Sequence, residues 1–218
     1  MVKKVNVKGV DVVLEKKKIK NMYLRYSEKY NAFCVTYSSL ISEKKVMEFI
    51  EANIEKMIKK KETKKSTLDE IKDGGFVYIF GAKLILRVVN DKKNYVEIKD
   101  PEVFVHIKDE SKLDVVYEKF QKDLLKSYLD YAVPIWVDQM GLCPSMYSIR
   151  TMKSKWGCCN TKTKKITFST MLIRKPKEFI DYVICHELAH IQVPNHGEAF
   201  KRILDIYYPE WKSIRKLR

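Results

Sequence analysis

The chain has 218 residues, of which 45% are hydrophobic and 11% aromatic, so it holds enough apolar material for a folded core, and wholesale disorder is excluded. Seven glycines and six prolines are too few for a collagen-like or low-complexity protein. The 43 basic and 28 acidic residues give a net charge of +15, spread along the chain, which favours an anionic partner such as nucleic acid, nucleotide or acidic peptide.

The first 110 residues have mostly the pattern of strands and predict a β-rich N-terminal region. Apolar and β-branched residues gather in short runs that turn residues separate. These runs cover residues 10–14, 22–26, 33–37, 76–80, 83–89, 95–98 and 103–107. Residues 42–60 differ, because their apolar side chains recur at helical intervals after Ser42, a suitable N-cap. We therefore expect one amphipathic helix there, followed by a connector over residues 63–73.

From about residue 111 the hydrophobic period becomes that of helices. A long helix is expected from residue 112, and Pro134 should kink or end it. Two strands, 149–155 and 165–169, should flank a loop at 156–160, and helices should follow over 177–192 and from about 197. No internal repeat is visible. The expected fold is α+β: a β-rich N-terminal half, residues 1–110, and a mostly helical half with a small sheet, residues 111–218.

Neither a secretion signal nor a membrane span is visible in the sequence. The basic start lacks an apolar stretch, and no segment approaches the roughly 18 apolar residues of a membrane helix. Five cysteines without C-x-x-C spacing do not indicate a disulfide framework. We expect a soluble, cytoplasmic protein with reduced cysteines and no membrane contact.

The residues most informative about function are His186-Glu187-Leu188-Ala189-His190. On a helix, positions i and i+4 lie on one face, so both imidazoles can reach the same metal ion. The glutamate at i+1 points about 100° away, where it can reach a water molecule held by that metal. This is the H-E-x-x-H pattern of zinc hydrolases, and it predicts a catalytic metal site.

A catalytic zinc usually has three protein ligands and one water, so a third ligand is needed. His196 is the nearest candidate, since Pro194 ends the helix and the following turn can return the ring to the metal. A carboxylate from the next helix is the alternative, and Glu198, Asp205 and Glu210 are available. We favour His196 because three of the four histidines then fall within eleven residues.

Residues 182–190, then Asn195-His196-Gly197 and Phe200, resemble the YgjP-like metallopeptidase domain family of zincins. Lys155-Trp156-Gly157-Cys158-Cys159, Ile166-Thr167-Phe168 and Pro209-Glu210-Trp211 are similar to further segments of that family, although it usually has arginine at position 155 and serine at 158. The resemblance implies a zincin-like metallopeptidase domain over residues 111–218. It also implies a site of three histidines, His186, His190 and His196, that binds one Zn²⁺ per chain.

We therefore expect a zinc metallopeptidase in which a metal-activated water attacks a peptide bond and Glu187 is the general base. Strand 165–169, expected at the edge of its sheet, would pair with an extended peptide. Arg150, Lys155 and Tyr147 are candidates to stabilise the developing oxyanion, with surface charge or core packing as the favoured alternative for each. Asp181 and Asp205 are candidates to orient the ligands, although we favour ordinary surface charge for both.

Two other functions stay open. The first is a metal-dependent nucleoside triphosphate (UTP) pyrophosphatase, an annotation that some family members carry. The second is a nucleic-acid-associated protease or binding protein, which the positive charge favours but no recognised DNA-reading motif supports.

Overall fold

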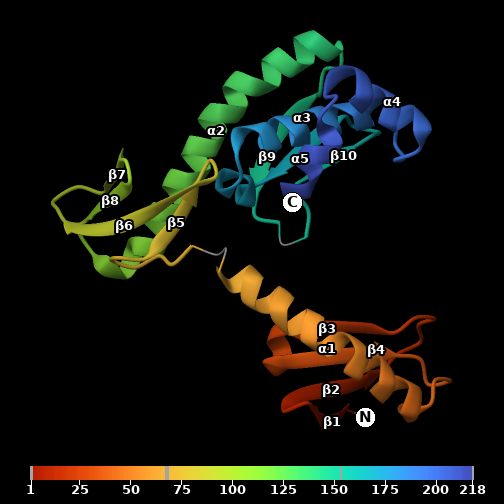
Figure 1. Ribbon diagram of the computed structural model, residues 1–218. Coiled ribbons are helices and arrows are strands. Elements are labelled where there is room, and N and C mark those ends of the chain that lie inside the picture. Colours follow the sequence, from red (N-terminus) through yellow and green to blue (C-terminus); the bar gives the residue numbers. More distant parts are fainter. Residues whose placement is uncertain (1, 67–68, 153, 218) are drawn as a thin grey trace. The chain divides into compact units, whose positions relative to one another are not determined.

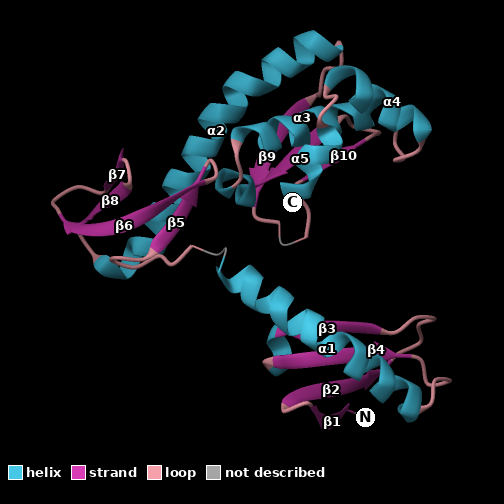
Figure 2. Cartoon of the chain, viewed as in Figure 1, coloured by secondary structure: helices cyan, strands magenta, loops and turns pink. Residues whose placement is uncertain are grey.

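The computed structural model describes residues 2–66, 69–152 and 154–217 (Figure 1). The chain divides into two compact units, residues 1–68 and 69–218, and each has its own hydrophobic core. Both units combine strands with helices, so the predicted α+β class is confirmed (Figure 2). None of the helices in the described residues is long and apolar enough to cross a membrane.

The first unit is a four-stranded sheet with one helix packed on it. Its elements are β1 (Val2–Val7), β2 (Val10–Lys16), β3 (Tyr23–Ser27), the 3₁₀ helix η1 (Glu28–Tyr30), β4 (Ala32–Tyr37) and α1 (Glu43–Ser66). The strand order is β1-β2-β4-β3, with β2 and β4 parallel and the other pairs antiparallel. Val46, Ile50 and Ile54 are fully buried because they lie one helical turn apart on the face toward the sheet. The predicted helix is confirmed and continues to Ser66, into the expected connector.

The second unit begins with another four-stranded sheet and a long helix. These are β5 (Phe76–Ile79), β6 (Ala82–Asn90), β7 (Tyr95–Lys99), β8 (Glu102–Ile107), the 3₁₀ helix η2 (Glu110–Lys112) and α2 (Leu113–Met140). Pro134 lies inside α2, which continues past it for six residues to Met140, so of the two expected effects, a kink or an end of the helix, the end is wrong. Helix α2 packs against β7 and β8. The junction expected between residues 110 and 111 therefore lies within this unit.

The two sheets, each with the helix that follows it, have the same topology. The order β5-β6-β8-β7, with β6 and β8 parallel, repeats the order of the first unit. Both opening hairpins turn through two residues with positive φ, Lys8-Gly9 and Phe80-Gly81. We call residues 1–68 the first module and residues 69–140 the second module. The absence of an internal repeat holds for the sequence and is wrong for the fold, because alternating apolar positions preserve a sheet without preserving residue identity.

The rest of the second unit is a small sheet with three helices. Its elements are β9 (Met146–Arg150), β10 (Gly157–Asn160), β11 (Lys165–Ser169), η3 (Thr170–Arg174), α3 (Lys177–Gln192), α4 (Glu198–Tyr207), α5 (Trp211–Ile214) and η4 (Arg215–Leu217). The sheet order is β10-β11-β9. Strand β11 is therefore central, and its expected position at the edge is wrong. The expected loop at 156–160 is mostly the strand β10, which is the edge strand beside α3.

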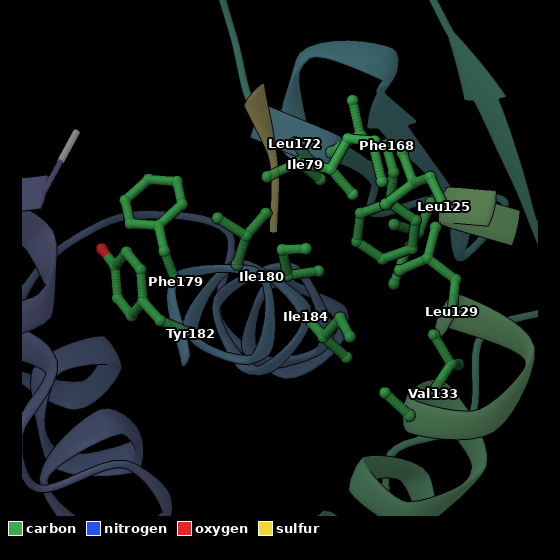
Figure 3. Close-up of a cluster of buried hydrophobic side chains, with 14 of the residues drawn as sticks. Ile79, Leu125, Leu129, Val133, Phe168, Leu172, Phe179, Ile180, Tyr182 and Ile184 are labelled. Carbon is green, nitrogen blue, oxygen red and sulfur yellow. The ribbon is translucent and has the colours of Figure 1, made fainter. Parts of the chain in front are cut away.

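Helix α3 is held in place by apolar contacts with α2. Ile180 and Ile184 of α3 and Leu125 and Leu129 of α2 belong to one cluster of buried side chains (Figure 3), and all four are fully buried. Fully burying one such side chain contributes about 1.5–3 kcal/mol. Because one face of α3 is fixed in the core, the direction of its opposite face is fixed as well.

A buried carboxylate joins the second module to η3. Asp69, whose side chain is 1% exposed, accepts hydrogen bonds from the backbone N–H of Tyr78 (3.0 Å), Gln121 Nε2 (2.7 Å) and Arg174 Nε (3.1 Å). These donors come from β5, α2 and η3. One side chain thus links three elements that are far apart in the sequence.

We expect Asp69→Ala to lower the free energy of unfolding of the second unit by about 3–5 kcal/mol, because Arg174 would keep a buried charge without its partner. Urea denaturation followed by tryptophan fluorescence measures this, since Trp136, Trp156 and Trp211 all lie in the second unit. Asp73→Ala is the control: Asp73 accepts one exposed hydrogen bond, from the backbone of Val88, and its loss should cost about 1 kcal/mol or less. Equal losses in the two variants would contradict the role given to Asp69.

Candidate metal centre and active site

Two histidines lie one turn apart on the face of α3 that the hydrophobic core leaves free. The predicted helix 177–192 is confirmed, and Phe179, Ile180 and Ile184 anchor its other faces. His186 and His190 are each partly exposed. Helix α3 ends at Gln192, with Pro194 just beyond it, and α4 begins at Glu198. The chain between the two helices returns toward α3 and carries His196.

The three imidazoles converge through the same nitrogen of each ring. The Nε2 atom of His196 lies 3.1 Å from Nε2 of His186 and 3.2 Å from Nε2 of His190. One ligand atom from each of the three residues lies within 4.8 Å of the others. Among the described residues this is the cluster of His, Cys, Asp and Glu side chains able to hold a metal ion.

The other faces of the rings fix their orientation. His190 Nδ1 lies 3.1 Å from the backbone oxygen of Val193, and His186 Nδ1 lies 3.4 Å from the hydroxyl of Tyr182. Phe200 packs against all three rings, with centroids 4.6–4.8 Å away. Burial lowers the pKa of His190, which favours the neutral imidazole that binds metals.

This donor set fits a zinc ion. Zinc takes imidazole nitrogens at about 2.0–2.1 Å in a tetrahedral arrangement, which puts neighbouring ligand atoms about 3.3 Å apart. The observed Nε2 separations of 3.1 and 3.2 Å are close to that value. The three residues therefore have the spacing to hold the metal.

Glu187 is buried beside the histidines, with 5% of the residue exposed. The backbone N–H of Cys159 on β10 donates to its carboxyl group, while its Oε2 atom has no hydrogen-bond partner among the described residues. Burial raises the pKa of Glu187 to about 7, although the positive charge of Lys155 and the hydrogen bond from Cys159 oppose this shift. A buried carboxyl with one free oxygen can accept and return a proton.

Gly157 on β10 makes room for this carboxyl group. A Cβ atom built at Gly157 would lie 2.7 Å from both Cγ and Oε1 of Glu187. Ordinary Cβ contacts are at least 3.4 Å, so any other residue would push the Glu187 side chain away. Glycine at position 157 thus has a steric reason, because a larger residue would clash with Glu187.

The site opens into a cleft of about 530 Å³ within the second unit. Aromatic side chains form much of its wall, from Trp156, Phe179, Tyr182, Phe200 and Trp211. Among the described residues of the lining, Glu187 is the one carboxylate, whereas three are basic: Lys155, Lys201 and Arg215. The cleft is therefore apolar and positively charged.

The carboxylates considered as alternative third ligands have other partners. Glu198 pairs with Lys201 at 2.5 Å, and Asp205 accepts a hydrogen bond from Trp211 Nε1 at 2.8 Å. Neither these nor Glu210 belongs to the candidate metal cluster. The histidine choice is thus the one that the geometry favours.

The residues considered for orienting the ligand histidines, Asp181 and Asp205, have other hydrogen-bond partners. Asp181 accepts from the hydroxyl of Tyr128 (2.8 Å), so neither it nor Asp205 orients a ligand histidine through a hydrogen bond of the structure. Tyr182 and the carbonyl of Val193 take that place. The signal for Tyr182 was its position one turn before His186, on the same helical face. A backbone carbonyl such as that of Val193 carries no signal in a sequence.

Of the three candidates for oxyanion stabilisation, Lys155 alone lines the cleft. Arg150 lies at the end of β9, and the hydroxyl of Tyr147 donates to Asp130 of α2. These two side chains therefore lie outside the cleft.

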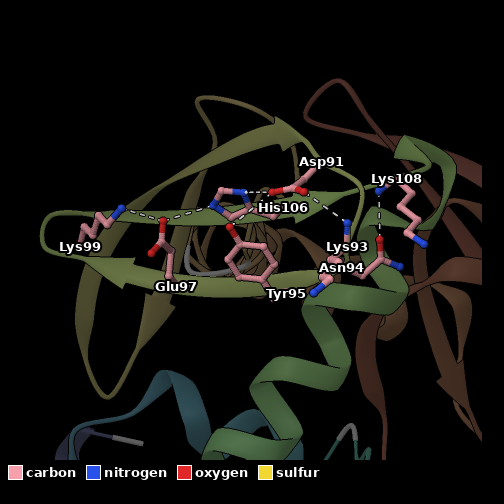
Figure 4. Close-up of polar contacts among 8 residues, drawn as sticks. All are labelled: Asp91, Lys93, Asn94, Tyr95, Glu97, Lys99, His106 and Lys108. Atoms are coloured by element: carbon pink, nitrogen blue, oxygen red, sulfur yellow. Dashed lines mark hydrogen bonds and ion pairs between the residues drawn. The ribbon is translucent and has the colours of Figure 1, made fainter.

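The fourth histidine, His106, lies in the second module, in a polar cluster of its own (Figure 4). Its Nδ1 is 3.0 Å from Asp91 and its Nε2 is 3.2 Å from Glu97. The ring of Tyr95 stacks on it with centroids 4.0 Å apart. The two carboxylates lie on opposite sides of the ring and do not converge, so His106 is a mostly buried strand residue apart from the candidate metal site.

Comparison with known proteins places the chain in a metallopeptidase class. The chain belongs to the YgjP-like metallopeptidase domain family, whose sequence model matches residues 20–217. The resemblance inferred from the motifs is thereby confirmed and extends over nearly the whole chain. No curated protein sequence matches it.

Two solved structures are similar to part of the chain. One is the metallopeptidase zymogen abylysin of Pyrococcus abyssi, with 24% identity and a TM-score of 0.38, covering 40% of this chain and 89% of that one. The other is the metallopeptidase zymogen jannalysin of Methanocaldococcus jannaschii, with 26% identity and a TM-score of 0.36, covering 40% and 90%.

We expect Gly157→Ala to lower peptidase activity by about 10–100-fold, because the added methyl group displaces the carboxyl of Glu187. Bound metal should be unchanged, since no ligand histidine is touched. Gly197→Ala is a matched control next to His196: a Cβ there meets nothing within 4 Å, and activity should stay within twofold. Activity assays and metal analysis on both proteins decide the matter, and full activity of Gly157→Ala would refute the steric role.

Proposed function

We propose that this member of the metallopeptidase family is a zinc-dependent peptidase that cleaves peptide bonds with Glu187 as general base. His186, His190 and His196 would hold one zinc ion per chain. The observation that supports this most strongly is the convergence of three Nε2 atoms beside a buried carboxyl group with a free oxygen. This arrangement supports metal-assisted hydrolysis.

The residues divide the chemistry among them. When bound, zinc supplies a Lewis acid that polarises the scissile carbonyl and lowers the pKa of water. Glu187 takes a proton from the attacking water at its free Oε2 and later delivers it to the leaving amine. The N–H of Cys159 holds the carboxyl in place during both transfers. Lys155, which lines the cleft, adds positive charge near the carbonyl oxygen as it becomes negative.

An extended peptide would bind along the outer edge of β10, the edge that does not pair with β11. The backbone N–H of Ser169 donates to Trp156 at 2.8 Å, so residues 156, 158 and 160 direct their backbone groups toward β11. Gly157 and Cys159 then direct theirs to the other edge, in agreement with the hydrogen bond from Cys159 to Glu187. Strand addition at this edge brings a substrate backbone next to the catalytic carboxyl.

We expect Glu187→Gln to lower kcat/KM on peptides by at least about 100-fold while zinc remains bound, because the amide cannot accept the proton. His186→Ala should lose the metal and the activity together. Glu178→Gln, an exposed position in the first turn of the same helix, serves as the control and should behave like the unmodified protein. Zinc content comes from elemental analysis, and cleavage from mass spectrometry of a digested peptide library.

The same proteins test the pyrophosphatase alternative. Hydrolysis of UTP without cleavage of any peptide, lost in Glu187→Gln, would refute the peptidase assignment but keep the metal site. Peptide cleavage that persists in Glu187→Gln would refute the general base.

Binding at the β10 edge makes a separate prediction about the substrate. A peptide with a methyl group on one backbone nitrogen next to the cleaved bond should lose at least tenfold in kcat/KM, because that nitrogen can no longer donate to the strand. The same methylation five residues away is the control and should have little effect. Equal rates for the two peptides would count against strand addition.

A further inference from the structure

One end of the first module brings together parts of the chain that are far apart in the sequence. Strands β2 and β4 are parallel and both end there, as the pairing of Lys16 with Tyr37 shows. Strands β1 and β3 are antiparallel to their neighbours and begin there, and Lys3 Nζ, 2.7 Å from Glu43, places the start of α1 at the same end. We call this region the lysine-rich end.

Eight lysines, all exposed, lie at the lysine-rich end. Two of them have carboxylate partners: Lys3 pairs with Glu43, and Lys17 with Glu15 at 3.0 Å. The other six have no ion-pair partner within the described part of the chain: Lys4, Lys16, Lys18, Lys20, Lys44 and Lys45. The excess of positive charge at this end is therefore not neutralised by the protein itself.

The second module shows that the fold does not need these lysines. By sequence the first module has 17 basic and 8 acidic residues, a net charge of +9, whereas the second has 11 and 14, a net charge of −3. The two modules can be aligned by matching Gly9 with Gly81, Tyr23 with Tyr95, and the first residues of α1 and α2. In the second module, the positions that correspond to the eight lysines then hold one lysine, Lys92, and one aspartate, Asp114. The same topology thus forms with the opposite charge, and the expectation that the positive charge is spread along the chain is wrong for these two modules.

A tyrosine at this end is free in the first module and engaged in the second. Tyr23, the first residue of β3, is 54% exposed and makes no ring contact with a described residue. Tyr95, the first residue of β7, stacks on His106 (Figure 4). The first module therefore presents an open aromatic face beside a cluster of lysines.

We propose that the lysine-rich end binds single-stranded nucleic acid. Lysines that lack carboxylate partners would contact successive phosphates, and their binding would release counterions. Tyr23 would stack on a base, since aromatic side chains beside a basic groove bind single strands without a sequence requirement. This site lies entirely within the first module and does not depend on the peptidase proposal.

An anionic lipid surface is the other polyanion to which lysines bind, and the structure favours it less. Stable attachment to a bilayer needs a second signal, such as a lipid chain or an apolar helix face. Among the described residues of the first module, Leu40 is the one strongly exposed large aliphatic side chain.

The test measures binding of the full chain to a fluorescein-labelled 30-nucleotide single-stranded DNA and RNA by anisotropy, at 50 and 200 mM salt. Lys16→Glu, Lys18→Glu and Lys20→Glu together should weaken binding at least tenfold and reduce the salt slope by about 2. The control changes three exposed lysines of the second module that have no ion-pair partner in the described residues: Lys92→Glu, Lys108→Glu and Lys122→Glu. This variant loses the same charge and should bind within about twofold of the unmodified protein.

Tyr23→Ala separates stacking from charge. It should weaken binding of the single strand at least fivefold and leave the salt slope unchanged. Cleavage of a short peptide should be the same in all these proteins. The binding measurements do not use this activity, so they test the lysine-rich end even if the peptidase proposal fails.

Three results would overturn the proposal: no binding at 50 mM salt, equal weakening by the two triple variants, or binding to phosphatidylserine vesicles without binding to either nucleic acid. Circular dichroism confirms that each variant is folded. If a triple Glu variant does not fold, the corresponding Gln substitutions give the same comparison.

Discussion

The packing of α3 against α2 is the contact on which the geometry of the candidate metal centre depends. Ile180 and Ile184 of α3 lie in the same buried cluster as Leu125 and Leu129 of α2, and the opposite face of α3, with His186 and His190, lines the cleft. Because both histidines lie on one helix, their spacing is fixed by helical geometry. The remaining freedom belongs to His196, which the chain between α3 and α4 brings to the same point.

The position of Glu187 follows from the same contact and from the edge strand β10. Burial of a carboxyl group is unfavourable for its charged form, and here it raises the pKa to about 7. One hydrogen bond from Cys159 and the nearby charge of Lys155 offset part of this effect. Gly157 leaves the space that the carboxyl occupies. Stability is thus given up locally in favour of a reactive group, which is common at catalytic sites.

The duplicated topology separates what the fold requires from what has been added to it. In the second module, α2 covers its own sheet and also packs against α3, so this copy supports the catalytic site. The first module uses the same strand order and the same hairpin turn with a separate core. Its excess of lysines has no counterpart in the second module and so calls for an explanation outside the fold.

The sequence alone determined the α+β class and the helix α3, and it supplied the three histidines and Glu187 as the proposed site, because helical spacing is local and can be read from residue intervals. It could not place β11 in the centre of its sheet or β10 at the edge, since strand order depends on contacts between distant residues. It also could not reveal the duplication, in which apolar alternation persists while the residues differ. The support of His190 by the carbonyl of Val193, and of Glu187 by the space at Gly157, comes from backbone atoms, and only the tertiary structure brings these to the site.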